Sequence, residues 1–112
     1  MKKKICYIAH PISGDIEANL KDLARILRFI NMLEPGDVRI IPIAPYYADI
    51  IALDDNNPLE RKRGIENDTA LIMTGVFDEL WLTGDKISFG MQEEIKLFRS
   101  LGKPIVDYTN KI

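Results

Sequence analysis

The chain has 112 residues, enough for one domain with a single hydrophobic core but short for two. Its 15 basic and 17 acidic side chains leave a formal net charge of -2, which gives no electrostatic basis for nucleic acid as a partner. No apolar run reaches membrane-spanning length, and the single cysteine, Cys6, lies in a run typical of a buried strand. We therefore expect one domain over residues 1–112 of a cytoplasmic protein, without membrane attachment, that binds a small molecule.

The first half of the chain predicts a strand, a helix and a second strand. Residues 5–9 are almost entirely apolar, as in a strand buried on both faces, and residues 10–15 follow as a loop shaped by proline and glycine. Asp15 can cap a helix whose apolar positions recur at helical spacing until about residue 34. Residues 38–43 predict the second strand, reached by a right-handed crossover.

The second half begins with an irregular segment. Residues 44–58 predict a long loop, which in a small domain is typical of a lid, a binding loop or a subunit contact. A helix over residues 59–73 follows, and its predicted core positions are Leu59, Ile65, Ala70 and Leu71. Residues 79–83 and 104–108 predict the third and fourth strands, and the helix between them ends at Gly102.

Strands that alternate with helices predict an α/β fold, a three-layer sandwich with a parallel sheet of about four strands in the order 2-1-3-4. Its switch point lies between the first and third strands. The loops over residues 10–15 and 84–90 should therefore flank one crevice, with Tyr7 beneath it. Ligands of open α/β sheets bind at such a crevice, and both loops carry polar groups that a core does not need.

The stretch over residues 88–95 joins a strand and a turn to the start of a helix. Ser88 offers a hydroxyl, Gly90 an approachable backbone and Glu94 a carboxylate one turn inside the helix, a combination suited to a sugar and a phosphate. A capped helix explains the same residues, because a serine N-cap stabilises any helix by about 1 kcal/mol. On the residues alone, the capped helix is the favoured interpretation. No acidic cluster has the spacing of a metal site, so no metal is expected.

Several segments taken together resemble a known family. They are Tyr7-Ile8-Ala9-His10-Pro11, Ser13-Gly14, Glu60-Arg61, Asp78-Glu79-Leu80-Trp81-Leu82 and Ser88-x-Gly90-x-x-x-Glu94. In this order they resemble the nucleoside 2-deoxyribosyltransferase-like superfamily over almost the whole chain, and within it a small branch common in bacteria and their phages. The resemblance implies a flavodoxin-like fold, a homodimer or larger homo-oligomer, and cleavage of the N-glycosidic bond of a nucleotide or nucleoside, with no cofactor expected.

The resemblance also implies roles for individual residues. Glu94 matches the nucleophile of characterised relatives, and Tyr7 matches the tyrosine that orients it. Asp68 is the nearest match to the general acid that protonates the departing base, and Asp55 is a second candidate. Ser88 stands where the nucleoside-monophosphate glycosidases of the superfamily carry a serine that holds the 5'-phosphate. The residues implied to bind phosphate are Ser88, Gly90, His10, Pro11, Ser13 and Gly14, helped by Arg61.

Two parts of the pattern differ from characterised relatives. His10 stands where they have a small residue, and as the only histidine it is interpreted as a structural hydrogen bonder rather than a catalyst. The relatives also continue past the position of Ile112 and complete the neighbouring subunit's pocket, so we expect the base-binding part to be missing or built differently. Tyr46 and Tyr47 from a partner subunit are candidates for it, whereas Glu93 is expected to face solvent.

Three functions of different classes remain open. An N-glycosidase or transferase acting on a nucleotide requires the Glu94 carboxylate. A nucleotide-binding or sensing module without turnover requires phosphate-dependent binding that survives loss of that carboxylate. A structural or partner-binding accessory protein of the phage type requires no nucleotide affinity.

Overall fold

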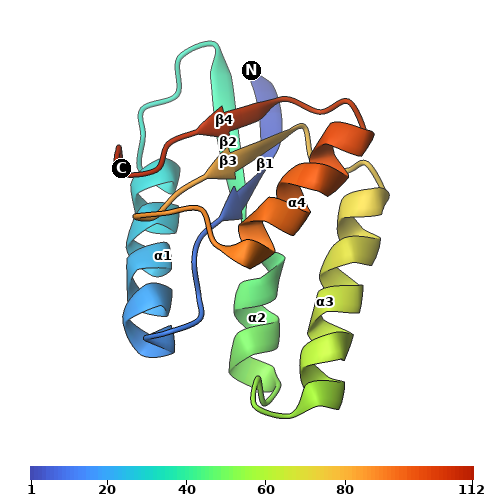
Figure 1. The fold of residues 1–112 in the computed structure, drawn as a ribbon. Helices are drawn as coiled ribbons and strands as arrows, with labels where there is room; N and C mark the ends of the chain where they lie inside the picture. Colours follow the sequence, from blue (N-terminus) through green and yellow to red (C-terminus); the bar gives the residue numbers. More distant parts are fainter.

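The computed structural model describes residues 1–112 as an α/β sandwich. Its elements, in chain order, are β1 (Lys2–Ala9), α1 (Ile16–Asn31), β2 (Val38–Ile43), α2 (Pro45–Ala52), α3 (Pro58–Met73), β3 (Glu79–Leu82), α4 (Phe89–Ser100) and β4 (Ile105–Asp107). All strand pairs are parallel, and the sheet order is β2-β1-β3-β4 (Figure 1). The predicted flavodoxin-like class and strand order are confirmed.

The sheet is covered on both faces because its central strand alternates between two cores. Cys6 and Ile8 of β1 belong to a buried cluster with α1, whereas Tyr7 and Ala9 belong to a second cluster with residues of α3 and α4. Successive side chains of a strand point to opposite faces, so an unbroken apolar run supplies both cores. Figure 1 shows α1 on one side of the sheet and α3 and α4 on the other.

Helix α1 begins and helix α4 ends at the predicted capping residues. Asp15 is the N-cap of α1, and its side chain accepts a hydrogen bond of 3.1 Å from the Ala18 backbone nitrogen. Gly102 follows α4 with a φ of 66°, the left-handed conformation that commonly ends a helix. Asp15 therefore ends the loop after β1 at the crevice, and Gly102 ends α4 at the opposite end of the sheet.

The prediction of an irregular loop over residues 44–58 is wrong for most of that segment. Pro45 to Ala52 form α2, and only a short connection separates this helix from α3. Pro45 occupies the first turn, where its fixed φ favours the helix and its missing N–H is not needed. The helix has no buried residue, and its eight residues are too few to distinguish a helical periodicity from a loop.

The core positions predicted for α3 are also wrong. Leu59, Ile65, Ala70 and Leu71 are all exposed, and Ile72 is the one buried residue of the helix. The cause is the position of α3, which extends beyond the sheet beside α2 rather than lying flat on it (Figure 1). The chain measures 44 × 29 × 22 Å along its principal axes, an elongated shape to which this pair contributes. None of the helices combines the length and apolarity needed to span a bilayer.

Candidate active site

The loops after β1 and β3 lie side by side, as the strand order requires. Thr83 bonds twice to the Ala9 carbonyl oxygen, through its backbone nitrogen at 2.9 Å and its hydroxyl at 2.8 Å. Gly84 has a φ of 90°, and a Cβ atom added to it would lie 2.6 Å from the Cδ of Pro11. The close approach of these loops fixes one end of the crevice.

Tyr7 forms the floor beneath the crevice. Its ring is fully buried and packs edge-on against Phe77 and Phe98, with centroid distances of 5.1 and 5.6 Å. Its hydroxyl contacts two carboxyl oxygens, the Oδ2 of Asp68 and the Oε2 of Glu94. One strand and two helices distant in sequence therefore bring two acids to one hydroxyl group.

Both acids are hard to ionise in this position. Burial, together with the charge of Asp68 and a hydrogen bond to it, raises the pKa of Glu94 to about 8, against the hydrogen bond from Tyr7. Burial also raises the pKa of Asp68 to about 6, with a contribution from the Asp49 charge. The Tyr7 hydroxyl has a pKa well above its ordinary value, because it is buried and faces both acids. At neutral pH this group therefore holds more protons than the same residues do in water.

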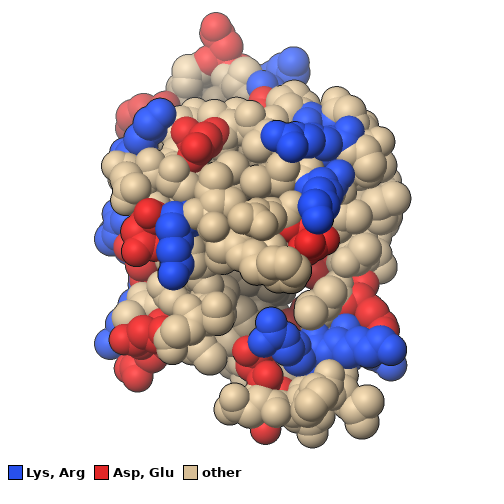
Figure 2. Space-filling model, viewed as in Figure 1, with Lys and Arg blue, Asp and Glu red and all other residues tan.

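The acids open into a cleft of about 320 Å³ between the sheet end and the helices. Its walls come from α2, α3, the start of α4 and the loop after β1. The residues that line it include Ile12, Ser13, Tyr46, Asp49, Leu53, Arg61, Ile65, Asp68, Ser88, Phe89 and Glu94. Figure 2 shows a hollow between the lower part of α3 and the rest of the molecule, with basic side chains beside it. A volume of this size is appropriate for a small organic ligand.

Asp68 carries an unsatisfied oxygen in this cleft. Its Oδ2 contacts Tyr7, but its Oδ1 is buried and has no hydrogen-bond partner within the chain. Buried carboxyl oxygens normally have a partner, because leaving one unpaired costs roughly 1–3 kcal/mol. A ligand in the cleft can supply the missing hydrogen bond.

Family comparison matches residues 4–108 to the model of a domain of unknown function, DUF7768. The chain belongs to the DUF7768 family. No curated protein and no solved structure gives a significant match. Any function of this DUF7768 domain must therefore be argued from its own side chains.

The start of α4 in the DUF7768 chain is compatible with both interpretations of its sequence, a capped helix and a ligand site. Ser88 is the N-cap, and its hydroxyl oxygen accepts a hydrogen bond of 3.3 Å from the Met91 backbone nitrogen, so the capped helix is confirmed. Ser88 and Gly90 also line the cleft, and Gly90 has open space where a Cβ would lie. Capping and exposure to a ligand are thus compatible at this position.

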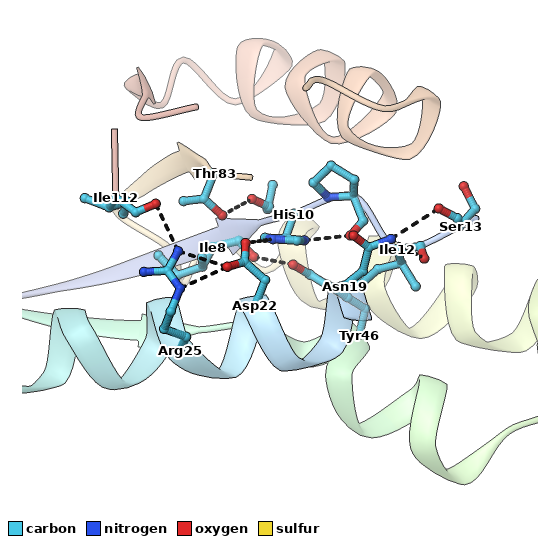
Figure 3. A network of polar contacts seen from close by, with 12 residues as sticks. Ile8, His10, Ile12, Ser13, Asn19, Asp22, Arg25, Tyr46, Thr83 and Ile112 are labelled. Carbon is cyan, nitrogen blue, oxygen red and sulfur yellow. Dashed lines mark hydrogen bonds and ion pairs between the residues drawn. The ribbon is translucent and has the colours of Figure 1, made fainter. Parts of the chain in front are cut away.

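His10 lies at the edge of the cleft in a hydrogen-bond network (Figure 3). Its ring is buried, with Nδ1 at 2.6 Å from the Pro11 carbonyl oxygen and Nε2 at 2.7 Å from the Asp22 Oδ2. Arg25 bonds to Asp22 and to the Ile112 carbonyl oxygen, which connects α1 to the end of the chain. Both ring nitrogens are therefore engaged within the protein, in agreement with the structural role predicted for His10.

The other predicted phosphate ligands differ in position. Ser13 and Arg61 line the cleft, and Arg61 forms an ion pair of 3.6 Å with Asp55, the second candidate acid. Pro11 is buried against Gly84, and Gly14 is exposed with a φ of 98°, so neither lines the cleft. The positive φ at Gly14 gives it a backbone role in the loop.

Sequence reasoning missed the wall formed by α2. Tyr46, Asp49 and Ile50 line the cleft with the i, i+3 and i+4 spacing of one helix face, and Leu53, the C-cap residue, continues this wall. The Tyr46 hydroxyl donates to the Ile8 carbonyl oxygen of its own chain at 2.6 Å, so Tyr46 forms part of the wall of its own chain's cleft. Glu93, expected to face solvent, is exposed at the rim of the cleft and pairs with Lys96 at 3.2 Å.

Proposed function

We propose that this protein cleaves the N-glycosidic bond of a nucleoside or nucleoside monophosphate through Glu94. The observation that carries the proposal is the single Tyr7 hydroxyl that contacts both Asp68 and Glu94 at a ligand-sized cleft. Retaining glycosidases usually have a pair of carboxyl groups with different pKa values, of which one acts as nucleophile and the other as acid. The resemblance of the motifs around Tyr7 and Glu94 to the deoxyribosyltransferase-like superfamily supports the same roles.

The reaction has two steps. A Glu94 carboxylate oxygen forms a bond to C1' of the sugar while the C1'–N bond breaks, and the departing base takes a proton from Asp68. The Asp68 carboxylate then removes a proton from water, which attacks C1' and releases the sugar. The second step regenerates the Glu94 carboxylate and the protonated Asp68.

The start of α4 and the loop after β1 are suited to the sugar end of the substrate. The N-terminal amides of a helix favour an anion, and Ser13, Ser88 and Gly90 lie on the lining of the same cleft. A 5'-phosphate or a 5'-hydroxyl is the group we place there. The base then lies toward α2 and α3, between apolar residues such as Leu53 and Ile65.

The deciding experiment measures release of free base by chromatography from ribo- and deoxyribonucleosides and their 5'-monophosphates. Wild-type protein should release base from at least one of them, and Glu94→Gln should lower the rate at least 100-fold. The matched control is Glu93→Gln, which neutralises the adjacent, exposed carboxylate and should retain activity. Equal loss in both variants, or release by a folded Glu94→Gln, contradicts the proposal.

A binding module without turnover is the second candidate, and one observation favours it. The raised pKa leaves Glu94 neutral at pH 7 in the unliganded cleft, and a neutral carboxyl group is a poor nucleophile. Calorimetric titration with the same nucleosides and nucleotides separates the two functions. Binding without base release, retained in Glu94→Gln, selects the module.

A homo-oligomer is the assembly we propose. Leu59, Ile65 and Phe89 are 79%, 57% and 75% exposed, and Ile65 and Phe89 lie on the lining of the cleft. Exposed large apolar side chains that share one part of a surface, as Ile65 and Phe89 do, are typical of contact sites. Sedimentation velocity should give more than one chain per particle, and a concentration-independent monomer contradicts the assembly.

A further inference from the structure

Counting hydrogen atoms at Tyr7 shows that the group holds an extra proton. The Tyr7 hydroxyl has one hydrogen, yet its oxygen contacts carboxyl oxygens of both Asp68 and Glu94. An ionised carboxylate can only accept a hydrogen bond, so one hydroxyl hydrogen satisfies one of the two contacts. The second contact requires a protonated carboxyl group that donates to the Tyr7 oxygen.

In the unliganded protein this proton is bound to Glu94 rather than to Asp68. It is more deeply buried than Asp68, and burial raises the pKa of Glu94 to about 8 and that of Asp68 to about 6. The other groups that face the pair are the Tyr46 hydroxyl, which has a raised pKa from burial, and the Asp49 carboxylate. Neither supplies a positive charge that would ionise Glu94, so Tyr7 donates to Asp68 and accepts from Glu94.

The proposed reaction needs the opposite arrangement of the same proton. Glu94 must be a carboxylate to attack C1', and Asp68 must be an acid to protonate the leaving base. The two arrangements have equal total charge and differ only in which carboxyl group carries the hydrogen. The Tyr7 oxygen lies between the two groups and contacts both.

We propose that Tyr7 is the proton relay that prepares both acids for the reaction in one step. The hydrogen on Glu94 Oε2 moves to the Tyr7 oxygen while the hydroxyl hydrogen of Tyr7 moves to Asp68 Oδ2. Two O–H bonds break and two form, Glu94 becomes a carboxylate, Asp68 becomes an acid, and Tyr7 is again a neutral phenol. This inference rests on the proposed function, because the transfer serves cleavage of the glycosidic bond.

The substrate itself favours the transfer. A ring nitrogen of the base accepts a hydrogen bond and so stabilises the protonated form of Asp68, whose Oδ1 has no partner in the unliganded chain. The electron-poor C1' carbon of the sugar stabilises a carboxylate at Glu94. The proton therefore moves when the cleft is occupied, and Glu94 stays neutral when it is empty.

The Tyr7→Phe variant tests the relay, because it keeps the packed ring and removes only the hydroxyl group. Two kinds of substrate are compared, an ordinary nucleoside and the pyridinium nucleoside nicotinamide riboside, whose base departs without a proton. At pH 7 the variant should lose about tenfold or more in rate on both, because only about a tenth of the Glu94 side chains are ionised one pH unit below a pKa of about 8. At pH 9.5, where solvent ionises Glu94, its rate on the pyridinium nucleoside should recover to within about twofold of wild type, while the ordinary nucleoside stays uncleaved.

Other outcomes overturn the relay. Loss of both activities at every pH gives Tyr7 a structural role only, and full activity at pH 7 makes the hydroxyl unnecessary. The proton count is tested separately by carbon-detected NMR of the Glu94 and Asp68 carboxyl carbons during a pH titration. In wild-type protein one of the two carboxyl groups should be protonated at pH 7, and in Tyr7→Phe the Glu94 step should move to higher pH, because the hydrogen bond that lowers its pKa is lost.

The two measurements distinguish failure of the relay from failure of the proposed function. If wild-type protein cleaves no nucleoside, the proposed function fails and the relay loses its reaction, whatever the NMR titration shows. If wild-type protein cleaves nucleosides but both carboxyl groups are ionised at pH 7, the proposed function stands and the relay is wrong.

Discussion

A Cβ atom on Gly84 would lie 2.6 Å from the Cδ of Pro11 and 3.3 Å from ring atoms of His10. Gly84 also has a φ of 90°, a conformation that residues with side chains rarely adopt. Gly84→Ala should therefore lower the free energy of unfolding by about 2–4 kcal/mol, measured by urea denaturation. Gly90→Ala is the control, because no atom lies within 4 Å of its added Cβ. Equal stability of the two variants would contradict the close packing of these loops.

The two buried acids predict that stability falls as pH rises. The unfolded chain releases the Glu94 proton near the ordinary value of 4.5, whereas the folded chain holds it until about pH 8. Between these values the unfolded state binds fewer protons, so the free energy of unfolding decreases with pH and then levels off. Asp68 adds a smaller decrease in the free energy of unfolding between pH 3.8, its ordinary pKa, and about pH 6.

Glu94→Gln removes the larger of these two contributions. The free energy of unfolding of this variant should vary less between pH 5 and 8 than that of wild type. At pH 8 it should exceed the wild-type value by on the order of 2 kcal/mol. Urea denaturation at a series of pH values measures both. A wild type that gains stability from pH 5 to 8 relative to Glu94→Gln would show that Glu94 is ionised in the folded cleft.

The Cys6 thiol should be unreactive in the folded protein. Burial, with the charges of Glu79 and Asp78, raises its pKa to about 12, and its side chain is inaccessible to solvent. Reaction with a disulfide reagent at pH 8 should be roughly 1,000-fold slower than in denaturant, because the thiolate forms only on opening. An Ala24→Cys, Cys6→Ala variant places the thiol on the exposed face of α1 and should react at once. Fast labelling of native Cys6 would contradict its burial.

Two acids on α1 should differ in their contribution to stability. Asp22 bonds to the buried His10 ring at 2.7 Å, whereas Glu17 pairs with Lys21 at 3.6 Å with both side chains largely exposed. Asp22→Ala should lower the free energy of unfolding by about 1–3 kcal/mol, because it leaves a buried ring nitrogen unpaired. Glu17→Ala should change it by less than about 0.5 kcal/mol. Thermal denaturation at pH 7 compares the two.

The fold could be predicted from sequence where burial on both faces leaves a clear signal. The run around Tyr7 and Ile8 could only be a central strand, and the order of strands and helices then fixed which loops meet. That order also brings Tyr7 near Glu94, because the carboxyl ends of β1 and β3 share one edge of the sheet. Topology therefore predicts that both residues lie at one crevice, whereas the contact between them is implied by the resemblance to the superfamily.

The α2 and α3 wall could not be predicted in the same way. Tyr46 and Asp49 lie on a helix without buried residues, and the apolar residues of α3 are mostly exposed, so neither helix shows a stripe that faces a core. The lining face of α2 mixes an aromatic, a carboxylate and aliphatic residues, as a ligand site does. Sequence patterns identify surfaces that face a core more readily than surfaces that face an empty cleft.

The scarcity of buried residues in this wall has a consequence for how the cleft works. α2 buries none of its residues and α3 only Ile72, so these helices can open locally at a lower free energy than the whole domain unfolds. Their amide hydrogens should exchange with deuterium well before those of β1 and β3. Opening of α3 would hydrate Asp68 and Glu94 and return both to ordinary acidity. The closed position of α3 is therefore what keeps the shared proton on the Tyr7 group.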